Sequence, residues 1–111
     1  MVELKDLKNI YLYPDTVSFA NGIPGLTNLI FTYFKETEIL NCLFIFFGKD
    51  KKQIKMIEIN EDGVWLYNKK LNNGNFILPK IEGKIKIDKQ QLITILTTIK
   101  GKKIRNNMRN L

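Results

Sequence analysis

The amino-acid sequence predicts an α+β fold, in which a mostly antiparallel meander sheet of five or six strands has two helices packed on one face. Apolar runs alternate with turn-forming residues between Leu43 and Pro79, which is typical of consecutive antiparallel strands. Apolar residues also recur at helical spacing in two segments, one before this meander and one after it. We expect a single domain over residues 1–100 and a basic, flexible tail over residues 101–111, because 111 residues provide one core but not two.

The first third of the chain predicts a short strand and a helix. The strand, Ile10–Tyr13, is followed by the turn signal Pro14-Asp15, and Val17–Gly25 is a loop rich in turn formers. A helix over about residues 24–36 follows from apolar residues at positions i, i+3, i+4, i+7 and i+8, namely Leu26, Leu29, Ile30, Tyr33 and Phe34.

Five further strands are expected after this helix: Leu43–Phe47, Ile54–Ile59, Val64–Asn68, Asn75–Leu78 and Lys84–Ile87. Glu61-Asp62-Gly63 and Asn72-Asn73-Gly74 supply residues that tolerate positive φ at tight reversals. The clean alternation of Lys84–Ile87 predicts one solvated sheet face. Ile54–Ile59 does not alternate, so we expect that strand to be either central or bulged.

A second helix is predicted from Asp88, where Asp88-Lys89-Gln90-Gln91 has the form of a capping box. Apolar residues then recur at helical spacing, at Leu92, Ile95, Leu96 and Ile99. Lys100-Gly101 is expected to end this helix. The residues beyond it carry several cations, no acid and few apolar side chains, so we expect a frayed or disordered end.

The composition excludes several classes of enzyme. The chain has no histidine, which rules out Ser-His-Asp triads, Cys-His pairs and the common histidine-containing zinc motifs. Its one cysteine, Cys42, has no partner for an internal disulfide and is expected to be a small buried hydrophobic residue. Gly22 and Gly25 lack the lysine of a phosphate-binding loop.

Four carboxylates near expected strand ends or turns, Asp15, Asp50, Glu61 and Asp62, raise the alternative of a two-metal nuclease site. Such a site needs acids that converge within a few ångströms, and the turn before Gly63 already accounts for Asp62. We therefore predict no enzymatic activity, no bound metal and no cofactor.

The sequence also gives an expected location. Its longest apolar run is far shorter than the ~18 residues that cross a bilayer. The N-terminus carries Glu3 and Asp6 where a signal peptide would be basic and then apolar. We expect a soluble cytoplasmic protein that does not associate with membranes.

The positive charge is concentrated in the second part of the chain. The net charge is +7, with −2 over residues 1–48 and +9 over residues 49–111. Such asymmetry is typical of proteins that approach nucleic acid or an acidic partner. A lysine-rich composition from an AT-rich genome is the alternative explanation.

Ten cations are candidate contacts to DNA. They are Lys49, Lys51, Lys52 and Lys55 around the first strand connection, Lys69, Lys70 and Lys80 at later strand ends, and Lys102, Lys103 and Arg105 in the tail. Lysines near a tight connection reach several phosphates together, and each neutralised phosphate releases counterions. All such contacts go to the backbone, so little sequence specificity is expected. The alternative is a turn and a tail kept polar for solubility.

Trp65 and Tyr67 share one face of an expected strand, while Val64 and Leu66 share the other. Exposed aromatic residues on a sheet stack on unpaired bases in single-strand binding modules. Core packing is the favoured interpretation here, because the domain needs large side chains to fill its interior.

The order of these motifs resembles the small accessory protein, TnpB or the second open reading frame product, of the bacterial insertion sequence sixty-six transposons. The resemblance covers about residues 9–100. It is carried by IYLY, NGIPGL and LFIFFGKDKKQIK, by Asp62-Gly63, by Tyr67 with Lys69-Lys70-Leu71, by Gly74 with Phe76, by Pro79-Lys80 and by the helix after Asp88.

This resemblance implies an accessory factor encoded beside a transposase and needed for efficient movement of the element. DNA, the transposase and other element-encoded proteins are the partners that it implies. Where the family shows a run like Asp-Met-Arg-Lys, this chain has Ser18-Phe19-Ala20-Asn21, so contacts made by that acid and those cations are not carried over. The alternative function is an adaptor that docks on the transposase or a partner accessory subunit, which an uncovered apolar patch or a dimer through an edge strand would favour.

Overall fold

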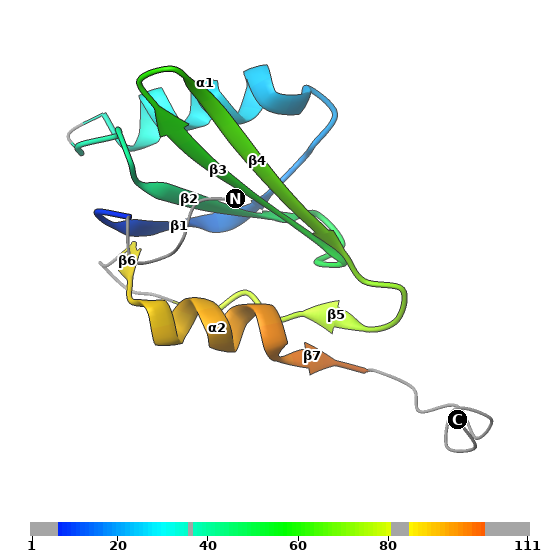
Figure 1. The fold of residues 1–111 in the computed structure, drawn as a ribbon. Coiled ribbons are helices and arrows are strands. Elements are labelled where there is room, and N and C mark those ends of the chain that lie inside the picture. Colours follow the sequence, from blue (N-terminus) through cyan, green and yellow to red (C-terminus); the bar gives the residue numbers. More distant parts are fainter. Residues whose placement is uncertain (1–6, 36, 81–84, 102–111) are drawn as a thin grey trace.

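The computed structural model describes residues 7–35, 37–80 and 85–101. Within these residues, five strands form the main sheet in the order β4-β3-β2-β1-β6 (Figure 1). Their bounds are Ile10–Val17 for β1, Leu43–Gly48 for β2, Gln53–Asn60 for β3, Gly63–Lys70 for β4 and Lys86–Ile87 for β6. The α+β class and the mostly antiparallel sheet are confirmed.

Strands β2, β3 and β4 form the predicted meander, joined by short reversals with an unbroken register from Gln53 to Asn60. Strand β3 is therefore central and regular, which decides between the two alternatives left open for it. Strand β1, by contrast, pairs with β2 in parallel, because helix α1 (Gly22–Tyr33) carries the chain back between them.

Strand β1 continues past the predicted turn at Pro14-Asp15 and ends at Val17. Its register against β2 shifts between Leu12 and Thr16. Proline has no amide to donate to a ladder and is tolerated where the pairing is irregular, so Pro14 marks a distortion within the strand instead of its end.

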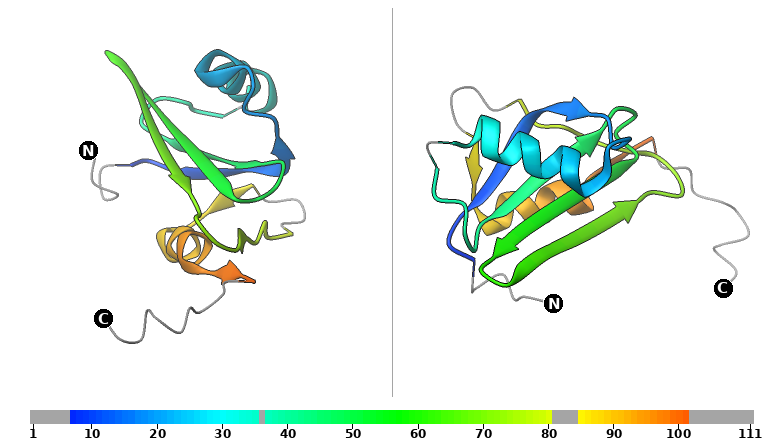
Figure 2. Two further views of the ribbon diagram at one scale, coloured as in Figure 1. Left: turned by 90° about the vertical axis from the view of Figure 1, so that its right-hand side faces the viewer. Right: turned by 90° about the horizontal axis from the view of Figure 1, so that it is seen from above.

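The two helices lie on opposite faces of the sheet, so the prediction that both pack on one face is wrong. One core joins α1 residues Leu26 and Ile30 to Phe44 and Phe46 of β2. The other joins residues of helix α2 (Lys89–Thr97) to Leu43, Ile45 and Phe47 of the same strand. Figure 2 shows the sheet between the two helices. Because successive side chains of a strand point to opposite faces, β2 is buried on both sides.

Helix α2 begins as predicted and ends earlier than predicted. The Asp88 side chain accepts a hydrogen bond from the Gln91 amide, and the Gln91 side chain accepts one from the Asp88 amide. The helix stops at Thr97, and the next residues form the short strand β7 (Ile99–Lys100). This strand pairs with β5 (Asn75–Phe76) in a second, two-stranded sheet, so β5 leaves the meander.

Candidate nucleic-acid interface

The loop between β2 and β3 is shaped by backbone hydrogen bonds and by one carboxylate. The Lys51 amide donates to the Gly48 carbonyl at 3.0 Å, which closes a turn. The Lys52 amide donates to the Asp50 carboxylate at 2.9 Å. Lys51 adopts a left-handed backbone conformation with φ of 58°. Lys49 and Lys51 are both exposed.

This loop is attached to the second sheet by hydrogen bonds. The Phe76 amide donates to the Lys51 carbonyl at 2.7 Å, and the Asn75 side-chain amide donates to the Asp50 carbonyl at 2.7 Å. The Lys52 ammonium donates to the Gly74 carbonyl at 3.3 Å. The β2–β3 loop and the β5 segment are therefore held together as one unit at this end of the molecule.

A pocket of about 380 Å³ lies where the loop meets the second sheet. Lys100 reaches it because β7 pairs with β5, with Lys100 opposite Asn75. The pocket is lined by Lys49, Asp50, Lys51, Asn75, Phe76, Ile77, Leu78, Lys100 and Gly101. Three lysines thus surround one depression, and Asp50 is the acid in its lining.

The three lysines of this pocket keep their charge available. Within residues 7–35, 37–80 and 85–101, none of Lys49, Lys51 and Lys100 takes part in an ion pair. An array of unpaired ammonium groups around a concave surface favours an anion that carries several charges. We call Lys49, Lys51 and Lys100 the basic pocket.

The remaining predicted contacts are distributed over several parts of the molecule. Lys52 follows Lys51 in the loop, and Lys70 lies beside it because it pairs opposite Gln53. Lys55 is on the α1 face, where its ammonium lies 5.0 Å from the centre of the Phe19 ring. Lys69 is on the α2 face and donates to the Leu96 carbonyl at 3.3 Å. These last two lysines therefore point to opposite faces of the sheet.

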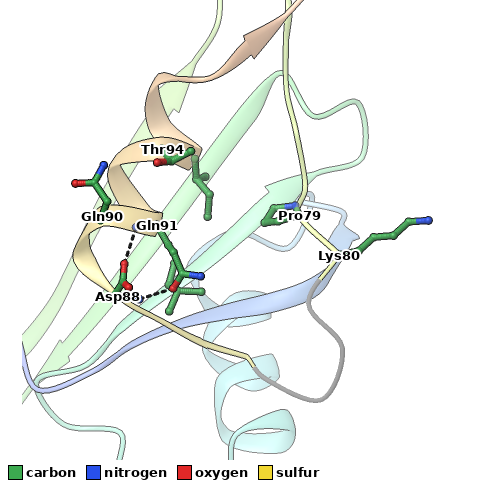
Figure 3. Close-up of a pocket in the computed structure, with 8 residues that line it drawn as sticks. Pro79, Lys80, Asp88, Gln90, Gln91 and Thr94 are labelled. Carbon is green, nitrogen blue, oxygen red and sulfur yellow. Dashed lines mark hydrogen bonds between the residues drawn. The ribbon is translucent and has the colours of Figure 1, made fainter.

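Lys80 lies apart from the basic pocket. It lines a separate pocket of about 350 Å³ beside α2, and its side chain extends away from that helix (Figure 3). The first turn of α2 at this pocket is already capped by Asp88 and Gln91, whose hydrogen bonds are drawn in Figure 3. Lys102, Lys103 and Arg105 lie outside the described residues.

Lys100 is the member of the basic pocket that was not among the predicted contacts. The sequence pattern predicts a helix that ends at Lys100-Gly101, and it groups this lysine with the basic tail that follows. Thr97, Thr98 and Ile99 just before it are all β-branched, and such residues favour strands over helix ends. That run was the available signal for β7, and hence for the position of Lys100.

A scan against protein-family models matches residues 8–106 to the IS66 Orf2-like protein family. The match spans nearly the whole 111-residue chain. This chain belongs to the IS66 Orf2-like family. It is thereby an accessory protein of an insertion sequence, as its motif order implied. Searches of curated proteins and of solved structures found no match.

The aromatic pair of this Orf2-like protein is more exposed than predicted. Trp65 keeps 46% of its surface accessible, so its assignment to the core is wrong. Tyr67 is half-buried against the α2-side core, and the two rings stack with centroids 6.4 Å apart. Glu58, directly opposite Trp65, is buried and accepts hydrogen bonds from Asn60 and Tyr67. A carboxylate beside these rings disfavours a phosphate there.

The acids and the one cysteine of this Orf2-like chain are the remaining residues that could carry chemistry. Among residues 7–35, 37–80 and 85–101, no group of three or more cysteines and carboxylates is placed to hold a metal ion. Cys42 is fully buried as predicted, and burial raises the pKa of its thiol, which disfavours the reactive thiolate. No helix in the described part of the chain is long and apolar enough to cross a membrane.

Proposed function

We propose that this insertion sequence accessory protein binds DNA through phosphate contacts made by the basic pocket. Lys49, Lys51 and Lys100 come from two separate parts of the sequence and line one concave surface. Their lack of carboxylate partners among the described residues is the observation that carries the proposal. Lys52 and Lys70 lie beside the pocket and extend its positive potential.

Contacts of this kind recognise the phosphate backbone and carry little sequence information. The accessory role then consists of weak, salt-sensitive attachment to the DNA on which the transposase acts. Lys55 and Lys69 are left out of this set because they point to opposite faces of the sheet, and Lys80 is left out because it lines a separate pocket beside α2. Lys102, Lys103 and Arg105 remain proposed contributors that follow the pocket along the chain.

The test is a salt titration of binding to duplex DNA with a triple variant, Lys49→Ala, Lys51→Gly and Lys100→Ala. Glycine is chosen at position 51 because that residue has a positive φ. Loss of three phosphate contacts should flatten the slope of log affinity against log salt by about 2 to 3 units.

A matched control removes the same charge elsewhere, with Lys35, Lys86 and Lys89 all changed to Ala. These residues lie around the opposite end of the sheet, where Lys86 pairs with Tyr11 near the start of β1. The control should leave the slope within about 1 unit of that of the wild type. If the slope changed equally in both triple variants, the proposal of a localised site would be overturned. The effect would then come from net charge alone.

A protein-docking function is the second candidate, and the outer face of α1 favours it. Ile23 and Phe31 lie two turns apart on this helix and keep 40% and 57% of their surfaces accessible. We propose the transposase or another accessory subunit of the same element as the partner in that case. An unchanged salt slope in the lysine triple variant, together with loss of transposase co-purification on Phe31→Lys, would support docking over DNA binding.

A further inference from the structure

Strand β4 leaves a complete row of backbone hydrogen-bonding groups without a partner strand. It lies at one end of the main sheet, and in the described part of the chain no strand pairs with its outer edge. Asn60 and Gly63 are paired across a two-residue turn, so alternate residues of β4 bond to β3. The amides and carbonyls of Val64, Leu66, Asn68 and Lys70 therefore face outward.

The centre of this edge is apolar and exposed. Val64, Trp65 and Leu66 keep 45%, 46% and 36% of their surfaces accessible. Val64–Tyr67 is a run of four uncharged residues in an edge strand whose pairing with β3 is regular from Gly63 to Lys70. Monomeric proteins protect such edges with bulges, prolines or charges at the centre, and β4 has none of these there.

Charges of opposite sign flank this apolar centre. Glu61 and Asp62 form the turn before β4, while Lys69 and Lys70 end the strand. A second β4 approaching in the parallel direction would place lysines beside lysines. A second β4 approaching in the antiparallel direction would place each acidic turn beside the partner's lysines, which stabilises the pair.

We propose that two copies of this chain pair antiparallel through their β4 edges, around a two-fold axis that passes through the sheet at Leu66. Leu66 then faces its own counterpart and Val64 faces Asn68 on the α1 side. On the α2 side, Trp65 faces Tyr67 of the other copy, and at both ends Asp62 lies opposite Lys70. One sheet runs continuously through both copies.

This register uses most of the strand, brings the two apolar centres together and puts the acidic turn of each copy beside the lysines of the other. In the antiparallel pair, the outward-facing amides and carbonyls of each β4 bond to those of the other copy. A two-fold axis relates the two identical edges. The aromatic pairs add contact area on the α2 side, where Trp65 is exposed in the single copy. The dimer does not depend on which ligand the basic pocket takes, because β4 contributes no residue to the lining of that pocket, and its Lys70 lies only beside it.

Sedimentation equilibrium of the whole chain tests the pairing, over concentrations from about 1 µM to about 1 mM. The mass should approach twice 13.0 kDa at the upper end. Leu66→Lys places two like charges on the axis and should return the mass to that of one copy. Circular dichroism checks that this variant is folded.

Charge reversal tests the register independently of Leu66. Asp62→Lys alone and Lys70→Asp alone should each raise the dissociation constant of the dimer about tenfold, and the double variant should restore it. Lys86→Asp, a reversal far from β4, should leave it unchanged. Failure of the double variant to restore the dimer would overturn the proposed pairing. A wild-type chain that stays monomeric over the whole concentration range would also overturn it. The exposed edge of β4 would then pair only with a strand from a different protein.

Discussion

Strands β2 and β4 have similarly apolar centres, yet β2 is fully buried and most residues of β4 are exposed. Leu43–Gly48 is buried at all six positions. In Gly63–Lys70, Tyr67 alone is partly buried and the other seven residues are exposed. Strand β2 has a neighbour on each edge and a helix on each face. Strand β4 has β3 on one edge only, and it touches the α2 side through Tyr67 and Lys69.

The difference shows that an apolar run indicates a strand but not the position of that strand in its sheet. The same kind of side chains stabilises the fold in β2, where they fill two cores, and remains available for association in β4. The value of an apolar residue to stability therefore depends on the burial that neighbouring elements provide. Three sets of substitutions distinguish the two strands experimentally.

The largest contrast is expected from the same substitution placed in each strand. Leu43→Ala in β2 should lower the free energy of unfolding by about 2–5 kcal/mol, because the side chain is buried and its removal leaves a cavity. Leu66→Ala in β4 should cost less than about 1 kcal/mol, because that side chain is already exposed in the single copy. Urea unfolding at high dilution measures both, and equal costs would contradict the contrast.

Substitutions in the connections that follow the two strands should change the free energy of unfolding by smaller amounts and with opposite signs. Lys51 after β2 and Gly74 after β4 both have positive φ, at 58° and 83°. Glycine adopts this conformation without strain, whereas lysine does not. Lys51→Gly should raise the free energy of unfolding by up to about 1 kcal/mol, and Gly74→Ala should lower it by about 1 kcal/mol or more. Thermal unfolding of the two variants gives the sign of each stability change. A Lys51→Gly variant less stable than the wild type would contradict backbone strain at Lys51.

Local elements were predictable from the sequence, because their signals lie within a few residues of each other. The capping box at Asp88 and the left-handed glycine at Gly74 are both present. The turn at Glu61-Asp62 closes without a positive φ, and the left-handed residue of the preceding loop is Lys51, for which composition gives no signal. Turn residues thus located the reversals but predicted the backbone conformation only at Gly74.

The placement of the helices was not predictable from helical periodicity alone. An amphipathic helix has one apolar face, and that pattern does not say which side of a sheet it covers. The informative signal was in β2, where Leu43 and Ile45 alternate with Phe44 and Phe46 and no position is polar. A strand that is apolar on both faces requires cover on both, which places the two helices on opposite sides.

The candidate site was only partly predictable, because it is assembled from distant segments. Lys49 and Lys51 follow directly from their loop, whereas Lys100 joins them through the pairing of β5 with β7. Lys55 and Lys69 are close to this loop in sequence or along the sheet but point to opposite faces. The alternation of side chains along a strand shows which lysines share a face of the sheet. The number of lysines near the loop in sequence does not show this.

The smallest effect tests whether the buried environment of β2 extends to Cys42, the residue before it. Burial raises the pKa of this thiol above its ordinary value of 9.0. The unfolded thiol therefore releases its proton at a lower pH than the folded one, and above about pH 9 the folded state binds more protons than the unfolded state. The free energy of unfolding should consequently fall as the pH rises from about 9 to about 10.

Cys42→Ala should remove this part of the pH dependence, together with the smaller effect of the Cys42 charge on Tyr11, whose pKa is raised above 10.0 mainly by burial. Comparing urea unfolding of the two proteins at several pH values between about 8 and 10 isolates the thiol. The wild type should lose stability relative to the variant across this range. If the difference in the free energy of unfolding between wild type and variant stayed constant with pH, Cys42 would be as accessible to water as the residues of β4. The buried environment would then be limited to β2.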